Sequence, residues 1–344
     1  MNEIGQIVIH KSFGEGKICR KEIEGKQQYI IVNFSIGEKK FVFPNAFTKY
    51  LKAKDEKFKE YVNSLLKSIN DKLEREKLKK PVVNVVHFNQ KKQNKRKNNE
   101  TEEANIAFKC NYCDGGKNKN RVGFRGACST TLISININEE KRVWCNQEEC
   151  PCFLYYNGKK TRKELDAECK EDFYVCYESQ LLREWTAYAG VYHMGEREGE
   201  PKKIKRETYN NLCILTTREP RTQEEDRFIF AVFLVDDSFE GDEYQEGYVC
   251  AHPKYRIELS PKEAKKMLFW KYYCNTSNNI PSWNSGLFRY VEDYVSAQIL
   301  RDISRLKKGT KEESLSKEFY EYYCKIHNID SANVGRVKGA LCKR

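Results

Sequence analysis

Short runs in which apolar and polar residues alternate open the chain and predict four β-strands. The runs cover residues 6–10, 16–20, 29–34 and 39–43, and glycines stand between them. Short strands joined by glycine turns are typical of a small all-β barrel. We therefore expect such a barrel over residues 1–53.

Apolar residues then recur three and four positions apart, which predicts a helix over residues 54–80 with one apolar face. The residues that carry this pattern are Phe58, Tyr61, Val62, Leu65, Leu66, Ile69 and Leu73. Residues 91–105, within the stretch 81–105 that follows the helix, show no apolar period, and five lysine or arginine residues fall between positions 91 and 97. This composition predicts a flexible linker, which is either a basic tether for phosphate backbones or a solvated spacer.

The C-terminal part contains both apolar runs, which are typical of strands, and segments with apolar residues three or four positions apart, which are typical of helices. Residues 211–217, 227–237 and 255–259 are expected strands, and the unbroken apolar run in residues 227–237 predicts a strand buried on both faces. Apolar spacing and capping residues predict helices over residues 178–190, 260–273, 290–306 and 314–327. We expect an α+β domain over residues 179–344, preceded by a cysteine-rich region over residues 106–178 in which residues 130–144 are β-like.

Three phrases in the first fifty residues, VIHKSFGEGKI, YIIVNF and EKKFVFP, resemble parts of SH3-like and Tudor-like barrels. The resemblance is to CarD-type RNA polymerase-interacting domains and to the C-terminal barrels of UvrD-type helicases. It implies a module that docks on a protein or on nucleic acid. Because a fold does not determine function, a packing module without a catalytic role is the alternative.

Charge favours a polyanionic partner. Lysine and arginine number 62 and aspartate and glutamate 50 among the 344 residues, which gives a net charge of +12. Nucleic acid is therefore the first partner to consider. The first residues lack the apolar core of a secretion signal, and no later run has the length of a membrane span. We expect a multidomain cytoplasmic protein that does not use a membrane.

Six of the fourteen cysteines fall between positions 110 and 152. Cytosolic cysteines stay reduced, so metal ligands or buried thiols are expected in place of disulfides. A Cys-x-x-Cys pair followed by Cys-x4-Cys-x-Cys suits a tetrahedral zinc ion. The candidate ligands are Cys110, Cys113, Cys145, Cys150 and Cys152.

Two further thiols, Cys128 and Cys176, lie near this pattern in the sequence. If both join, the enlarged set suits a second ion or an iron–sulfur cluster. The alternative for each is an ordinary buried cysteine. A catalytic thiol is not expected, because no histidine lies in this block.

The loop GGKNKNRVGFRG, next to the first cysteine pair, is dense in positive charge. Its candidate nucleic-acid contacts are Lys117, Lys119, Arg121 and Arg125, with Phe124 as a ring for stacking. Basic side chains around an aromatic ring suit phosphate and base contacts. The alternative is a solvated loop.

The order of strands and helices over residues 211–273 resembles PUA-like domains of the EVE and YTH type, which read modified or flipped bases. The phrases CYES, LTTREP, FAVFLVDD and WNSGLFRY also resemble a bacterial family without an assigned activity. The resemblance to PUA-like base readers implies an aromatic base pocket. Its candidate residues are Trp270, Trp283, Phe288, Tyr290, Arg218 and Arg289. The alternative is that these tryptophans belong to the core.

Residues 236–246 contain six acids after a buried strand, and carboxylates at a strand end can hold magnesium for phosphodiester cleavage. The Glu-x-Lys that such nucleases carry does not follow, so a solvated acidic loop is the alternative. The five histidines are scattered and fit no hydrolase pattern.

These observations favour a noncatalytic protein that binds nucleic acid, with DNA favoured over RNA, and that carries a structural zinc ion. The resemblances suggest a reader of modified bases in bacterial DNA restriction or defence. The alternatives are a metal-dependent nuclease that uses residues 236–246, and a scaffold whose barrel docks on RNA polymerase or a helicase.

Overall fold

A computed structural model describes most of the chain. The residues described are 2–10, 14–24, 27–35, 37–44, 46–49, 51–79, 103–170, 175–192, 195–206, 208–243, 245–275, 280–283 and 286–342. They form two compact units, Met1–Asn99 and Glu100–Arg344. Most of the expected basic linker lies outside the described residues. In the described part, no helix is both long and apolar enough to cross a bilayer.

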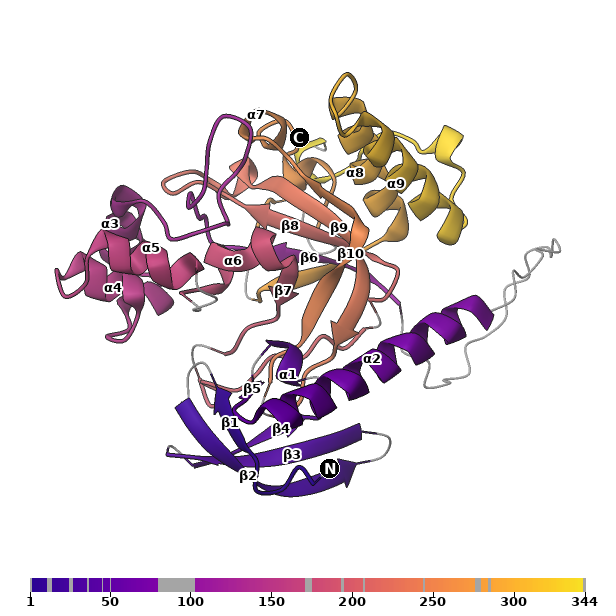
Figure 1. Cartoon of the computed structure of the whole chain (residues 1–344). Helices are drawn as coiled ribbons and strands as arrows, with labels where there is room; N and C mark the ends of the chain where they lie inside the picture. The colour runs from indigo at the N-terminus through magenta and orange to yellow at the C-terminus, as the bar shows by residue number, and fades with distance from the viewer. Residues whose placement is uncertain are drawn as a thin grey trace. The chain divides into compact units, whose positions relative to one another are not determined.

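The Met1–Asn99 unit contains one antiparallel sheet with the strand order β4-β3-β2-β1-β5 (Figure 1). Its strands are β1 (Ile7–His10), β2 (Gly14–Glu24), β3 (Gln27–Phe34), β4 (Gly37–Val42) and β5 (Leu51–Ala53). The first four agree with the strands expected from the alternating runs. Each pairs with its neighbour in the chain, as glycine turns between short strands favour.

A long helix completes this unit. After the short α1 (Ala46–Lys49), α2 spans Glu56–Lys79, and Asp55 caps it by accepting the Phe58 N–H at 2.8 Å. Phe58 and Val62 are buried in the core of the sheet. The predicted apolar face of α2 therefore packs as expected as far as Leu66, and the side chains of Ile69 and Leu73 lie outside the described part.

The Glu100–Arg344 unit has a six-stranded sheet with the order β11-β6-β8-β9-β10-β7. The strands are β6 (Asn105–Lys109), β7 (Thr186–Tyr188), β8 (Leu212–Thr217), β9 (Phe228–Phe239), β10 (Tyr248–Glu258) and β11 (Phe288–Val291). β6 and β8 run parallel, and the other neighbouring strands are antiparallel. The regions that we expected as 106–178 and 179–344 thus contribute to one sheet.

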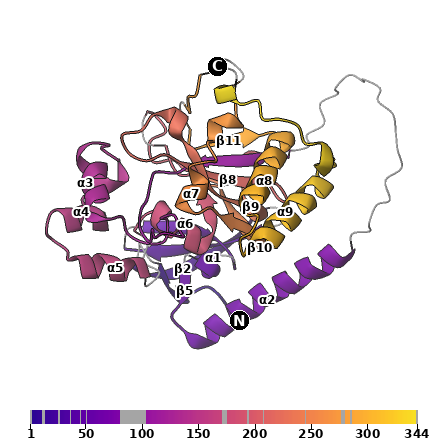
Figure 2. The same cartoon turned by 90° about the horizontal axis from the view of Figure 1, so that it is seen from above.

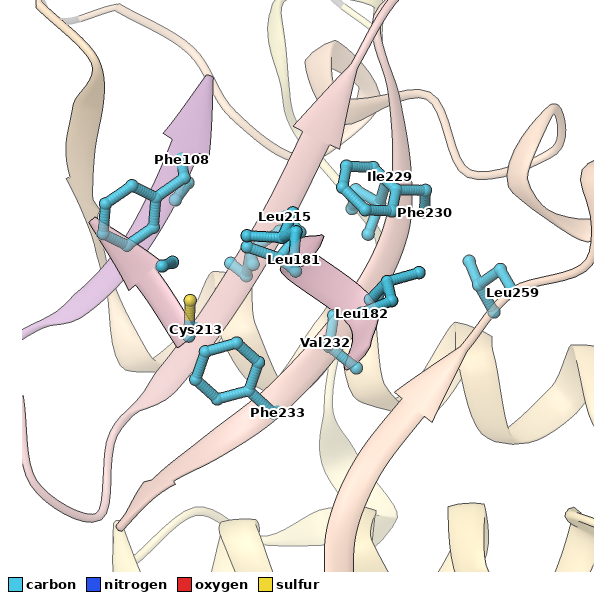
Figure 3. Close-up of a cluster of buried hydrophobic side chains, with 14 of the residues drawn as sticks. Phe108, Leu181, Leu182, Cys213, Leu215, Ile229, Phe230, Val232, Phe233 and Leu259 are labelled. Atoms are coloured by element: carbon cyan, nitrogen blue, oxygen red, sulfur yellow. The ribbon is translucent and has the colours of Figure 1, made fainter. Parts of the chain in front are cut away.

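The core of this unit lies on the central strands. The first eight residues of β9 are buried, as its unbroken apolar run predicts, and all six residues of β8 are buried as well. Figure 3 shows Leu181 and Leu182 of α6 (Tyr177–Glu184) among side chains from β6, β8 and β9. This helix therefore covers part of the sheet with the leucines of its apolar face.

The cysteine-rich segment is helical where we expected strand. Residues 130–144 contain α3 (Thr130–Asn138), with Ser129 accepting the Leu132 N–H at its start. The buried residues Leu132, Ile133, Asn136 and Ile137 follow helical spacing. Two further helices, α4 (Pro151–Tyr156) and α5 (Arg162–Lys170), gather beside α3 in both views (Figures 1 and 2). Tertiary packing here outweighs the β preference of threonine and isoleucine.

Three helices follow the central strands. α8 (Asp293–Leu306) and α9 (Glu313–Ile326) pack against each other and agree with the expected helices (Figure 2). α7 is much shorter than the helix expected over residues 260–273, because it ends at Ala264. Beyond it the Met267 carbonyl accepts the Ile229 N–H, so the chain leaves the helix to pair with β9.

Candidate metal centre

Six cysteines from separated segments line one cavity of about 40 Å³. They are Cys113, Cys128, Cys145, Cys150, Cys152 and Cys176. We call the space that they line the cysteine cavity. A cavity of about 10–15 Å³ already holds a water molecule, so this one has room for an ion. The set includes both thiols whose participation the sequence left open.

The first two sulfurs are brought together by a tightly packed loop. The backbone of Gly115 and Gly123 passes so close to other backbone that a Cβ would lie 1.9 Å from the Gly126 oxygen and 1.6 Å from the Cys113 oxygen, respectively. Only glycine fits at these two positions. The loop returns Cys128 to Cys113, and a hydrogen bond between their thiols raises the pKa of Cys128.

Cys150 and Cys152 stand at the start of α4 and are hydrogen-bonded to each other. Their hydrogen bond lowers the pKa of Cys150 to about 6 and raises the pKa of Cys152. Burial raises the pKa of Cys145 to about 12. Cys150 is therefore the sulfur that most readily becomes a thiolate, while burial keeps Cys145 protonated until a cation is present.

Cys176 enters the cavity from the start of α6, where burial and the nearby Glu178 raise the pKa of its thiol. Cys110, the first candidate ligand, is placed differently. It follows β6 and its N–H donates to the Thr216 carbonyl at 2.8 Å, and its side chain is not among those that line the cavity. The cavity thus joins four of the five candidate ligands with Cys128 and Cys176.

The sulfurs surround the cavity without forming a finished ligand shell. Within the described residues, no three His, Cys, Asp or Glu side chains stand close enough to hold one ion as they are placed. Zinc would have to draw four of these sulfurs inward. The donor set fits such an ion, because thiolates are ligands that zinc prefers and binding a cation offsets the cost of charging buried thiols.

The basic loop is folded around core residues. Lys119 and Arg121 are exposed, whereas Lys117 donates to the Tyr112 hydroxyl at 2.8 Å and Arg125 pairs with Glu258 at 2.5 Å. Phe124 lies in the same loop, and we expected its ring to be available for stacking on a base. Phe124 is 1% exposed and stacks on Phe230 with ring centres 4.0 Å apart, so its ring belongs to the core.

The predicted aromatic pocket is divided in the structure. Trp270 and Trp283 are core residues with their rings 6.4 Å apart, so neither offers an open face to a base. Arg289 lies over the Trp283 ring at 5.4 Å. Tyr290 lies elsewhere and accepts the Arg206 N–H at 3.1 Å.

Two further members of the predicted pocket have partners of their own. Arg218 reaches Glu224, at 3.4 Å, and Glu224 also accepts the Trp270 indole N–H at 3.3 Å. Phe288 packs against Phe108 with ring centres 5.9 Å apart. Four of the six candidates therefore meet around Glu224 and Arg227, two residues that sequence reasoning missed, while Phe288 and Tyr290 do not join them.

The acids at 236–246 do not form a single loop. Asp236 and Asp237 lie inside β9, which continues to Phe239. Asp242 accepts the Gln245 N–H at 2.8 Å, and Glu246 accepts the Tyr177 hydroxyl. The carboxylates are thus spread over a strand and the turn that follows it. Two of those in the turn, Asp242 and Glu246, already accept hydrogen bonds.

Comparison with known proteins adds no relative to these observations. The chain matches no protein-family model, no curated protein and no solved structure.

Proposed function

We propose that this chain is a noncatalytic nucleic-acid-binding protein whose cysteine-rich segment is stabilised by zinc. The observation that carries the proposal is the distribution of charge between the two units. Residues 1–99 contain 23 lysines and arginines against 11 acids, whereas residues 100–344 contain 39 against 39. The whole excess of +12 therefore belongs to the N-terminal unit.

The N-terminal sheet presents part of this charge to solvent. Lys17 on β2 pairs with Ile7, and Lys52 on β5 pairs with Ile9, so both lysines flank β1. Both side chains are exposed, and Ile9 between these strands is 42% exposed. Lysines beside an apolar contact point suit a phosphate backbone, since each neutralised phosphate releases a counterion.

Zinc has a structural role in this proposal. The cysteine cavity would hold the ion with four of its six sulfurs, and the bound ion would tie the Cys113–Cys128 loop to α4 and α6. Zinc supplies folding energy in segments of this kind, because the ligand set forms only when the chain folds. The short helices α3, α4 and α5 expose much of their surface, so a metal crosslink would compensate for a thin core.

Salt dependence of binding tests the nucleic-acid proposal. The full chain should bind duplex DNA with an affinity that falls steeply with salt, at a slope of about 0.9 per phosphate contact. Replacing Lys17 and Lys52 with glutamine should reduce this slope. The matched control is Lys262→Gln with Lys266→Gln, two exposed lysines of the neutral unit. Binding that ignores salt, or a control that flattens the slope as much as the test pair, would refute the assignment.

A further inference from the structure

Four neighbouring strands of the C-terminal sheet bring one cation each to the same edge. Lys109 ends β6, and Arg289 of β11 pairs with Ala107, so both side chains leave the same face of the sheet. β6 and β8 are parallel, with Lys109 aligned to Thr216. Their C-terminal ends therefore lie side by side.

The next two cations close the neighbouring strand pair. Thr217 of β8 pairs with Phe228 of β9, and Arg218 and Arg227 are the residues immediately beyond that pair. We call Lys109, Arg218, Arg227 and Arg289 the strand-edge cations. They come from positions far apart in the sequence, and the register of the sheet gathers them.

One carboxylate serves this group. Glu224 lies 2.5 Å from Arg227 and 3.4 Å from Arg218. Among the described residues, no carboxylate lies within 4.0 Å of the Lys109 or Arg289 side-chain nitrogens. The strand edge thus holds an excess of positive charge inside a unit that is neutral as a whole.

Three donors at this edge have no acceptor in the described part of the chain: Arg227 Nη1, Arg289 Nε and the Trp283 indole nitrogen. Arg227 and Trp283 are each 2% exposed, and the Arg227 guanidinium lies 5.0 Å from the centre of the Trp283 ring. Arg289 lies over the same ring at 5.4 Å. A buried donor without a partner costs about 1–3 kcal/mol, and more when it is charged. An acceptor that reaches the indole N–H and the two guanidinium donors would remove this cost.

The charges around Lys109 and Arg142 also favour a bound anion. Lys109 is half-buried, and the charges of Arg227, Arg142 and Arg218 repel its ammonium while the charge of Glu224 attracts it. Arg142 comes from the cysteine-rich segment, where its Nη2 pairs with Glu140 at 2.9 Å and its Nε lacks an acceptor among the described residues. The charge of Lys109, which has no such carboxylate partner in the described part of the chain, is unfavourable there unless an anion joins it.

We propose that the strand-edge cations bind a phosphate-class oxyanion between Lys109, Arg227, Arg289 and the Trp283 N–H. Guanidinium forks match the spacing of two oxygens on such an anion, and an ammonium adds a point charge. The phosphate comes either free from solution or attached to a nucleotide. This site is independent of nucleic-acid binding by the N-terminal unit.

Thermal unfolding of the full chain in millimolar phosphate, compared with chloride at equal ionic strength, tests the proposal. Phosphate should raise the melting temperature, and isothermal titration should give a dissociation constant that weakens about tenfold or more in Lys109→Met, as expected for losing a charge-assisted hydrogen bond. Arg289→Gln should have a similar effect. Lys266→Met, at an exposed lysine, is the matched control and should keep wild-type affinity.

Several outcomes separate a binding site from a structural cluster. In chloride, Lys109→Met should be as stable as the wild type or more stable, because it removes an unpaired charge. Equal stabilisation of wild type and Lys109→Met by phosphate would overturn the proposal, since a general salt effect does not distinguish them. So would a wild type that responds no more to phosphate than to chloride, the result expected if water satisfies these donors. A nucleoside 5′-monophosphate that competes with phosphate shows that attached phosphates enter, and failure to compete assigns the site to the free anion.

Discussion

Replacing Phe124 with alanine should destabilise the C-terminal unit, although Phe124 lies in a loop rich in lysine and arginine. Its ring is 1% exposed and stacks on Phe230 at 4.0 Å with 5° between the planes. Truncating a buried phenylalanine to alanine costs about 3–5 kcal/mol, of which the aromatic pair contributes about 0.5–1.5 kcal/mol. We therefore expect a loss of about 3–5 kcal/mol in the free energy of unfolding.

The backbone of Phe124 allows a sharper comparison. Its φ is +69°, in the left-handed region, which costs a residue with a Cβ roughly 1–2 kcal/mol. Glycine avoids this cost but loses about 0.5–1 kcal/mol of chain entropy. Phe124→Gly should therefore be about 0.5–1 kcal/mol more stable than Phe124→Ala, although both lack the ring.

Urea unfolding followed by tryptophan fluorescence measures these differences. The four tryptophans, Trp144, Trp185, Trp270 and Trp283, all lie in the C-terminal unit, so the signal reports on that unit alone. Wild-type stability in Phe124→Ala together with lost DNA binding would refute the reasoning and place the ring on the surface. Phe124→Leu is the control, and it should recover most of the loss because it refills the space.

Three further changes test other parts of the structure. Lys307→Met should cost about 3–5 kcal/mol in the same urea assay, because the ammonium is buried 2.9 Å from Glu263. Burial raises the pKa of Glu3, but hydrogen bonds from Lys21 and other donors outweigh this and leave that pKa below 4.5. The N-terminal unit should thus lose stability as pH falls from 4.5 through the lowered pKa, and circular dichroism should show a smaller loss in Glu3→Gln. Gly123→Ala should disrupt the loop at Cys113 and reduce the near-ultraviolet dichroism of the C-terminal unit.

Local sequence patterns were sufficient where an element is defined by its own residues. The apolar run of β9, the stripe of α2 as far as Leu66 and the helix start at residue 260 all appear in the structure. The helix over Thr130–Asn138 was missed because its threonines and isoleucines favour strands. Ser129, a good N-cap residue directly before this run, was the available signal.

The candidate sites depend on contacts between distant segments, which local patterns do not contain. The spacing of cysteines indicated Cys113, Cys145, Cys150 and Cys152, but it could not decide whether Cys176 joins them. That depends on where α6 begins relative to the loop.

The strand-edge cations could not be grouped from local sequence patterns either. Arg218 and Arg289 were selected as part of an aromatic pocket. Lys109 and Arg227 were missed, because only the register of β6, β8 and β9 places them together.

Metal analysis of the purified chain tests the cysteine cavity most directly. We expect about one zinc per chain. It should be lost together with stability in Cys113→Ser and in Cys176→Ser, and kept in Cys110→Ser, whose sulfur lies outside the cavity lining. The exposed Cys342 supplies the matched control, since Cys342→Ser should also keep the metal. A folded, metal-free chain would contradict the account, as would zinc that follows Cys110 and ignores Cys176.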